Sequence, residues 1–285
     1  MSVSTNNIHW FPGHMKKAIN QIEEKIKNVD VVVELCDARC PLSSLNPLLE
    51  EKIKNKPRLL VLSKSDLADE KIFDSYNDYF LSLNYKVIIG SFKDNKFAKR
   101  IASLIVELGK EKQQKYIAKG MKPQPIKTMI IGVPNVGKST LINKLANRSA
   151  AGVENRPGFT RAQQWIKVSN EFFLLDTPGI LPMNYEDKNS ATKLALVGCI
   201  REDILPNDVL FEYLLDFLKE YYPDALLDRF KIENLNIEYD EIALQIAQTR
   251  GLKKGSDFDL DKARILLLKE FKDGLLGKMS LDRII

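Results

Sequence analysis

Hydrophobic and polar positions alternate in two ways along this chain. Aliphatic and aromatic runs bounded by polar residues predict buried strands at residues 29–35, 58–62, 86–89, 128–131, 164–168 and 172–175. Between them, apolar residues recur three and four positions apart, which predicts helices at residues 18–26, 46–53, 68–83, 95–116 and 138–146. Strands that alternate with helices are typical of an α/β fold with a mostly parallel sheet.

The strand pattern stops after about Tyr185. The rest of the chain shows only helical periodicity, at residues 191–199, 208–222, 241–249 and 260–275. We therefore predict three parts: an N-terminal arm and first helix at 1–28, an α/β domain at 29–185, and a small all-helical domain at 186–285.

Composition and charge narrow the class of protein. The chain has 285 residues, of which 44% are hydrophobic and 28% charged, values that exclude a wholly disordered chain. No apolar run is long enough to span a membrane. The N-terminus has no secretory pattern and there are only three cysteines, so we expect a cytoplasmic protein.

The net charge of +5 is unevenly distributed. Residues 93–127 hold ten basic and three acidic side chains, residues 202–241 hold three basic and twelve acidic ones, and residues 250–285 hold nine and six. Basic segments of this kind are either solvated surfaces or RNA-backbone contacts. The layout suggests that RNA would contact residues 93–127 and the extreme C-terminus, with the acidic helices turned away.

The strongest chemical signal lies between a predicted strand and a predicted helix, where residues 132–139 read GVPNVGKS. This matches the P-loop pattern, in which backbone N–H groups and a helix N-terminus surround phosphates. Lys138 would reach the β- and γ-phosphates, and the Ser139 hydroxyl would bind Mg²⁺. We assign to nucleotide binding Asn135, Val136, Gly137, Lys138, Ser139 and Thr140.

Asp176 follows the strand at 172–175 and opens a D-x-x-G motif that ends at Gly179. A carboxylate at a strand end can hold Mg²⁺ beside a P-loop, and the Gly179 amide could contact the γ-phosphate. Between the two motifs, Thr160 lies in a Gly- and Asn-containing stretch that could order around Mg²⁺. The alternative is that Thr160 is an ordinary loop residue.

The base specificity is indicated by a third motif. Ser63-Lys64-Ser65-Asp66 follows the strand at 58–62 and is similar to the N-K-x-D motif of GTPases. The Asp66 carboxylate would accept hydrogen bonds from the guanine N1 and N2 groups, and the Lys64 stem would lie along the base. Ser63 replaces the usual Asn, which places nucleotide affinity in question. Ser91, after the next strand, gives a partial match to a further guanine-contacting element.

The base motif here precedes the phosphate motif, the reverse of the usual order. In this order, and in the stretches HWFPGHM at 9–15, DARCP at 37–41 and PGFTRAQQW at 157–165, the chain resembles the circularly permuted GTPases of ribosome biogenesis. The resemblance implies a P-loop NTPase-type sheet. It also implies GTP hydrolysis stimulated by ribosomal particles, with the large ribosomal subunit and its rRNA as partners. We expect no membrane partner and a monomer.

The position after Gly179 is Ile180, which cannot orient the attacking water as the Gln of Ras-like enzymes does. The resemblance implies that His9 acts instead, on a mobile arm; the alternative is that His9 anchors the arm or contacts RNA. It also implies that Asn135 helps to hold a K⁺ ion, the alternative being a loop-stabilising role.

Permutation places the end of the GTPase domain beside Gly179. We therefore expect nucleotide state to reorient residues 190–285. Two rival functions remain: a P-loop ATPase or kinase, which Asp66 disfavours, and a nucleotide-gated switch that binds protein rather than RNA.

Overall fold

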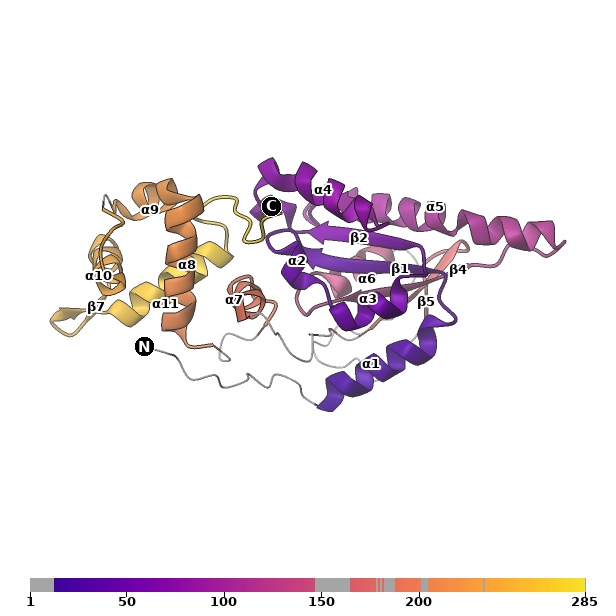
Figure 1. Cartoon of the computed structure of the whole chain (residues 1–285), viewed down its shortest axis with the longest axis horizontal. Coiled ribbons are helices and arrows are strands. Elements are labelled where there is room, and N and C mark those ends of the chain that lie inside the picture. Colours follow the sequence, from indigo (N-terminus) through magenta and orange to yellow (C-terminus); the bar gives the residue numbers. More distant parts are fainter. Residues whose placement is uncertain are drawn as a thin grey trace.

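The computed structural model describes residues 13–146, 165–177, 179, 181, 188–200, 205–232 and 234–284. An α/β domain lies at one end of its long axis, and most of a helical C-terminal region, here the described residues within 188–284, lies toward the other (Figure 1). The predicted boundary near residue 185 falls outside the described residues.

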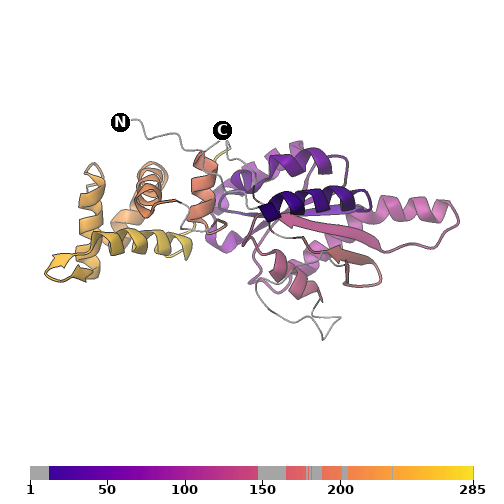
Figure 2. The same ribbon diagram turned by 90° about the horizontal axis from the view of Figure 1, so that it is seen from below.

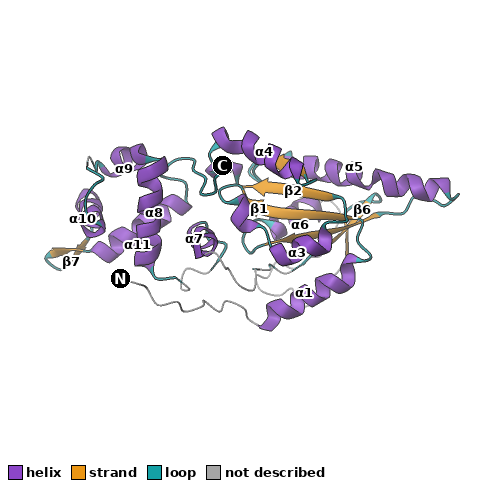
Figure 3. Cartoon of the chain, viewed as in Figure 1, coloured by secondary structure: helices purple, strands orange, loops and turns teal. Residues whose placement is uncertain are grey.

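A six-stranded sheet forms the α/β domain. Its order is β3-β2-β1-β4-β6-β5, and only the edge strand β5 is antiparallel to its neighbour. The predicted mostly parallel sheet is therefore confirmed (Figure 3). The strands are β1 (Val31–Asp37), β2 (Arg58–Ser63), β3 (Lys86–Ile89), β4 (Ile126–Gly132), β5 (Trp165–Lys167) and β6 (Phe172–Leu175).

Helices cover both faces of this sheet (Figure 2). Alternate residues of β1 take opposite sides: Val31 and Val33 pack in the cluster that includes α5 and α6, whereas Val32 packs with α1 and α3. Burial on both faces explains why β1 is an unbroken apolar run rather than an alternating one. The helices of this domain are α1 (Gly13–Ile26), α2 (Pro41–Ser44), α3 (Pro47–Ile53), α4 (Phe73–Ser82), α5 (Phe97–Ala118) and α6 (Lys138–Ala146).

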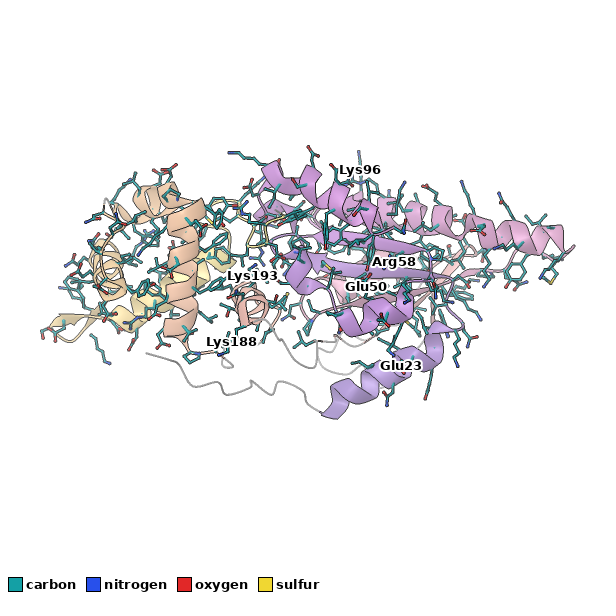
Figure 4. The ribbon with its side chains drawn as sticks, in the orientation of Figure 1. Glu23, Glu50, Arg58, Lys96, Lys188 and Lys193 are labelled. Carbon is teal, nitrogen blue, oxygen red and sulfur yellow. The ribbon has the colours of Figure 1, made fainter. Side chains whose placement is uncertain are left out.

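Ion pairs also hold helices to the sheet. Arg58 of β2 and Glu50 of α3 lie side by side (Figure 4), and their charged atoms are 2.8 Å apart.

The helix predicted at 68–83 is shorter than the apolar pattern suggested. The chain makes two 3-10 turns, η1 (Ser65–Leu67) and η2 (Glu70–Ile72), before α4 begins. The Asp69 side chain accepts a hydrogen bond from the Lys71 N–H. Such a local side-chain bond starts a new turn and interrupts a continuous helix.

The C-terminal region contains α7 (Lys188–Leu196), α8 (Asn207–Tyr221), α9 (Pro223–Phe230), α10 (Tyr239–Arg250) and α11 (Leu260–Lys272). The predicted helical C-terminal region is confirmed, with one addition: β7 (Lys253–Lys254) and β8 (Asp257–Phe258) form a short antiparallel hairpin that helical periodicity did not predict. Gly251 and Gly255 flank β7 with φ of +64° and +67°. Left-handed glycines end α10 and form the hairpin turn.

The C-terminal tail, residues 279–284, returns to the α/β domain. Its Asp282 is buried and accepts hydrogen bonds from the Ser43 N–H, the Ser43 hydroxyl and the Lys193 ammonium at 2.8–2.9 Å. Ser280 and Arg283 of the tail also bond to the Ala38 carbonyl and the Tyr222 hydroxyl. The expectation that the extreme C-terminus contacts RNA stays a prediction. Exposed basic residues of the C-terminal region include Lys278, directly before the tail, and Lys253 and Lys254 of the β7–β8 hairpin.

Candidate nucleotide-binding site

The carboxyl ends of the five parallel strands form the candidate site. Asp37 at the end of β1 lies opposite Ser63 at the end of β2, and Leu35 lies opposite Gly132 at the end of β4. Ligands of open α/β sheets bind at such an edge. The structure thus brings together the phosphate loop (residues 132–139), the base loop (residues 63–66) and the second base loop (residues 90–93), although they are far apart in sequence.

Two glycines shape the phosphate loop. Gly132 has φ of +143°, and a Cβ there would lie 2.3 Å from the carbonyl oxygen of Leu35. Gly137 has φ of +103° and lies against the Phe92 ring of the second base loop. Only glycine fits such a conformation with so little space. Helix α6 begins directly afterwards at Lys138, so its free N–H groups face the loop.

Lys138 lies inside this loop. Its ammonium donates to the carbonyl oxygens of Gly132 and Val133 at 3.0 and 2.8 Å. Burial lowers the pKa of Lys138 to about 8, although the nearby Asp176 opposes this shift. A phosphate group would favour the charged form of this lysine.

Asp176 and Gly179 lie beside the phosphate loop. Burial raises the pKa of the Asp176 carboxyl, and the positive charge of Lys138 partly offsets this. A Cβ at Gly179 would lie 3.0 Å from the backbone of Pro134, so this glycine contacts the loop closely. Ser139 and the neighbouring Thr140 are exposed at the start of α6. The Ser139 hydroxyl and the Asp176 carboxylate are hard oxygen donors of the kind that Mg²⁺ prefers.

The base loop and the second base loop meet at Asp66. Its carboxylate is 2.7 Å from the Lys93 ammonium. Burial raises the pKa of Asp66, but hydrogen bonds from Lys93 and Ser91 outweigh this and lower it overall. The Ser65 N–H donates to the Gly90 carbonyl at 3.2 Å, which joins the two loops through the backbone as well. Asp66 is therefore a carboxylate that stays ionised and partly exposed.

Ser63 connects the base loop to the phosphate loop. Its hydroxyl oxygen is fully buried and lies 2.7 Å from the Val136 carbonyl and 3.0 Å from the Cys36 carbonyl. Ser63 thus joins the two loops, although its side chain is shorter than that of the usual Asn.

Asn135 and Gly198 connect the phosphate loop to the C-terminal region. The Asn135 amide donates to the Gly198 carbonyl at 2.8 Å, just beyond the end of α7. The Asn135 backbone has φ of +61°, a conformation that Asn tolerates better than most side chains do.

Asp37 and Arg39 also lie at this edge, and the sequence motifs gave neither side chain a role. Asp37 is fully buried and makes a two-point contact with the Arg39 guanidinium at 3.0 Å, and the Lys64 ammonium lies 2.9 Å from the same carboxylate. Burial raises the pKa of Asp37, but Arg39 and Lys64 reverse this and hold it below its usual value. The sequence signal that could have identified Asp37 is its position as a carboxylate at the end of a buried strand.

Two predicted residues, His9 and Thr160, lie outside the described residues, as does Ile180. The structure brings together the remaining ones: Ser63, Lys64, Asp66, Ser91, Asn135, Val136, Gly137, Lys138, Ser139, Thr140, Asp176 and Gly179.

A P-loop, an acidic motif beside it and a base loop with an ionised aspartate, all at one edge of a parallel sheet, define a GTPase whose motifs occur in permuted order. Known proteins agree with this class. Residues 127–222 match the family described as 50S ribosome-binding GTPase. The Bacillus cereus protein named ribosome biogenesis GTPase A is 45% identical over 96% of this chain and 93% of its own length. The Priestia megaterium protein of that name is 43% identical over 96% of both chains.

This chain belongs to the ribosome biogenesis GTPase A family. Solved structures agree on the fold. The GDP-bound structure of YlqF has 28% identity and a TM-score of 0.66, over 92% of this chain and 98% of that one. The GNP-bound structure of YlqF from T. maritima has 29% identity and a TM-score of 0.65, over 94% and 98%.

Proposed function

We propose that this protein is a GTP-hydrolysing assembly factor that acts in maturation of the large ribosomal subunit, in the cytoplasm and as a monomer. The observation that carries the proposal is the meeting of a phosphate loop with the ionised Asp66 at one sheet edge, in a chain of this family. The family match described as 50S ribosome-binding GTPase supports the large subunit as partner.

The site residues divide the chemistry between binding and positioning. Lys138 would neutralise charge on the β- and γ-phosphates, and Gly179 would contact the γ-phosphate through its N–H. Ser139, Asp176 and Thr160 would hold Mg²⁺, which supplies further positive charge to the transferring phosphoryl group. His9 would orient the attacking water, because Ile180 cannot. Asn135 would contribute to a K⁺ site that adds positive charge beside the phosphates.

Two basic segments support an RNA partner of large size. Exposed lysines along α5 and the loop that follows it include Lys110, Lys119 and Lys122. The β7–β8 hairpin carries Lys253 and Lys254, also exposed. The far end of α5 and this hairpin lie at opposite ends of the long axis (Figures 1 and 2). One small RNA helix would not reach both, whereas a ribosomal particle would.

One hydrogen bond supports a coupling between nucleotide state and the orientation of residues 190–285. Asn135 of the phosphate loop bonds Gly198 of the C-terminal region. A ligand that draws the Asn135 side chain toward a bound K⁺ or phosphate would break this bond. Domain-distance measurements with GDP and with a GTP analogue, with and without ribosomal RNA, should therefore differ; equal distances in all four states would contradict the coupling.

The rival functions make different predictions. A P-loop ATPase or kinase would bind ATP in competition with GTP, whereas Asp66 predicts that excess ATP does not displace GDP. A switch that binds only protein would show no steep dependence of ribosome binding on salt concentration. RNA-backbone contact predicts a steep decrease in affinity as salt increases.

The decisive test is the rate of GTP hydrolysis with and without purified ribosomal particles. We expect stimulation by large-subunit precursors, and no stimulation by any particle would contradict the ribosomal assignment. A charge-reversed double variant, Lys119→Glu with Lys122→Glu, should lose stimulation while keeping the basal rate. The matched control, Lys71→Glu with Lys231→Glu, changes net charge equally at exposed sites outside both basic segments and should keep both rates.

A further inference from the structure

The Asp37 carboxylate occupies a particular position in the sheet. Asp37 is the last residue of strand β1, where it pairs in register with Ser63 of β2, the residue before Lys64. On its other side, β1 pairs with β4, the strand that leads into the phosphate loop. The Asp37 side chain is fully buried, and two cations share it: Arg39 through two nitrogens, and Lys64 through its ammonium. A buried carboxylate needs such partners, and each cation in turn depends on the carboxylate.

The backbone around Lys64 is fixed on both sides. Lys64 itself has φ of +57°, in the left-handed region. Ser63 before it is bonded to the phosphate loop, and Ser65 after it is bonded to Gly90. With the backbone held and the ammonium held at Asp37, the Lys64 stem has both ends fixed. A long side chain that is already ordered loses little further freedom when a ligand contacts it.

The other cation faces the C-terminal region. Beyond Asp37, the Arg39 guanidinium donates to the Lys272 carbonyl at the end of α11 and to the Val197 carbonyl after α7, both at 3.1 Å. Arg39 is almost fully buried. A planar guanidinium can bind one carboxylate at two points and still reach two carbonyls, a geometry that an ammonium cannot reproduce.

We propose that Asp37 is a positioning residue for guanine recognition, which fixes the Lys64 stem in the orientation that receives the base, while Arg39 holds Asp37 against the C-terminal region. The proposal rests on the base-contacting role assigned to Lys64 in the proposed function. It makes the C-terminal region a structural support of the base loop in addition to any role in binding a partner.

The test measures GDP affinity of the full chain in a double-variant cycle. Asp37→Asn and Lys64→Met should each weaken GDP binding about three- to tenfold, the scale expected when one long side chain must be ordered on binding. The combined variant should show no further loss, because Asp37 acts only through Lys64. If the two losses multiply instead, Asp37 has only a general structural role and the proposal is overturned.

Lys64→Met alone keeps the proposal testable even where Asp37→Asn does not fold. It retains an unbranched stem, removes the ammonium and alters a side chain that is only partly buried. Wild-type GDP affinity in Lys64→Met would show that anchoring the stem at Asp37 has no effect and would overturn the proposal. In hydrolysis assays, both single variants should raise the KM for GTP with kcat unchanged.

Binding of a nucleotide with a different base distinguishes this proposal from the proposed function. Inosine diphosphate lacks the exocyclic amine of guanine but offers the same ring plane. Asp37→Asn should therefore weaken binding of GDP and inosine diphosphate by the same factor, whereas Asp66→Asn should weaken GDP more. If Asp66→Asn leaves GDP affinity unchanged, the guanine site itself is wrong; if only the Asp37 result fails, the positioning role is wrong.

Arg39→Lys tests the connection to the C-terminal region. It keeps the positive charge but cannot hold Asp37 at two points and also reach both carbonyls. We expect about a threefold loss of GDP affinity, which disappears in the Lys64→Met background. Unchanged affinity in Arg39→Lys would contradict the part of the proposal that concerns Arg39.

Discussion

The hydroxyl of Ser63 lies 2.7 Å from the carbonyl oxygen of Val136, so that one short side chain joins the base loop to the phosphate loop. The two residues are 73 positions apart in sequence and meet because β1 places the ends of β2 and β4 on either side of it. A nucleotide that contacts both loops would therefore bind to parts whose separation is already set.

Removing this contact should weaken nucleotide binding. We expect Ser63→Ala to reduce GDP affinity and to lower the free energy of unfolding by about 1–2 kcal/mol, because the buried Val136 carbonyl loses a donor. Fluorescence titration and chemical denaturation measure the two effects. Ser82→Ala removes an exposed hydroxyl on α4 and should change neither quantity; equal effects of the two substitutions would contradict the role of Ser63.

The low pKa of Lys138 predicts a pH dependence of GDP binding. Above its pKa of about 8, free Lys138 is neutral and must take up a proton to pair with phosphate, whereas below pH 7 it is already charged. The contribution of Lys138 to GDP affinity should therefore be constant below pH 7 and fall about fivefold between pH 8 and 9.

Calorimetry in two buffers of different ionisation enthalpy should show proton uptake on GDP binding at pH 8.5 and little at pH 6.5. Lys144→Met, at a partly buried lysine of the same helix, should keep this dependence. Affinity that is constant up to pH 9, without proton uptake, would show that Lys138 stays charged in the free protein.

Glu34 predicts a pH dependence of stability. It lies in β1 and bonds the Tyr85 hydroxyl at 3.0 Å, and burial raises its pKa from 4.5 to about 7. Between these two values the folded protein binds more protons than the unfolded chain, so this group makes stability fall as pH rises from about 4.5 to 7. Removing the carboxylate should abolish this contribution.

Consider the free energy of unfolding of Glu34→Gln minus that of the wild type. We expect this difference to be about 2–3 kcal/mol larger at pH 8 than at pH 4.5. Chemical denaturation at both pH values measures the difference. Glu24→Gln, at an exposed position of α1, should show the same stability change as wild type between the two pH values. A Glu34→Gln difference that does not vary with pH would mean that folding does not change the pKa of Glu34.

The attachment of the C-terminal tail depends on Asp282. Asp282→Ala would leave Lys193 and Ser43 without their buried acceptor, and we expect a loss of about 3 kcal/mol in the free energy of unfolding. Trypsin should also cut faster after Lys278, directly before the tail. Asp208→Ala, at an exposed position in the first turn of α8, serves as the control. Unchanged cleavage at Lys278 would contradict this role of Asp282.

Local sequence determined much of the site. Residues 132–139 carry the spacing that a phosphate-binding turn requires, and α6 begins at Lys138, as its periodicity predicted. The strands were also predictable, because short aliphatic and aromatic runs between polar boundaries favour strand structure. Two further local signals were present: Pro223 begins α9, and glycines flank β7. They were not interpreted as a new helix and a hairpin, because the residues on either side follow helical periodicity.

Tertiary structure alone decided which groups meet. The contacts of Asp37 with Lys64, Asn135 with Gly198 and Ser43 with Asp282 join residues that no local pattern links. They depend on the parallel register of β1 with its neighbours and on the return of the tail across the α/β domain. The sequence by itself therefore determined the chemistry of the nucleotide site, because motif spacing is local. The connection of that site to the C-terminal region arises from long-range packing, which only the folded chain specifies.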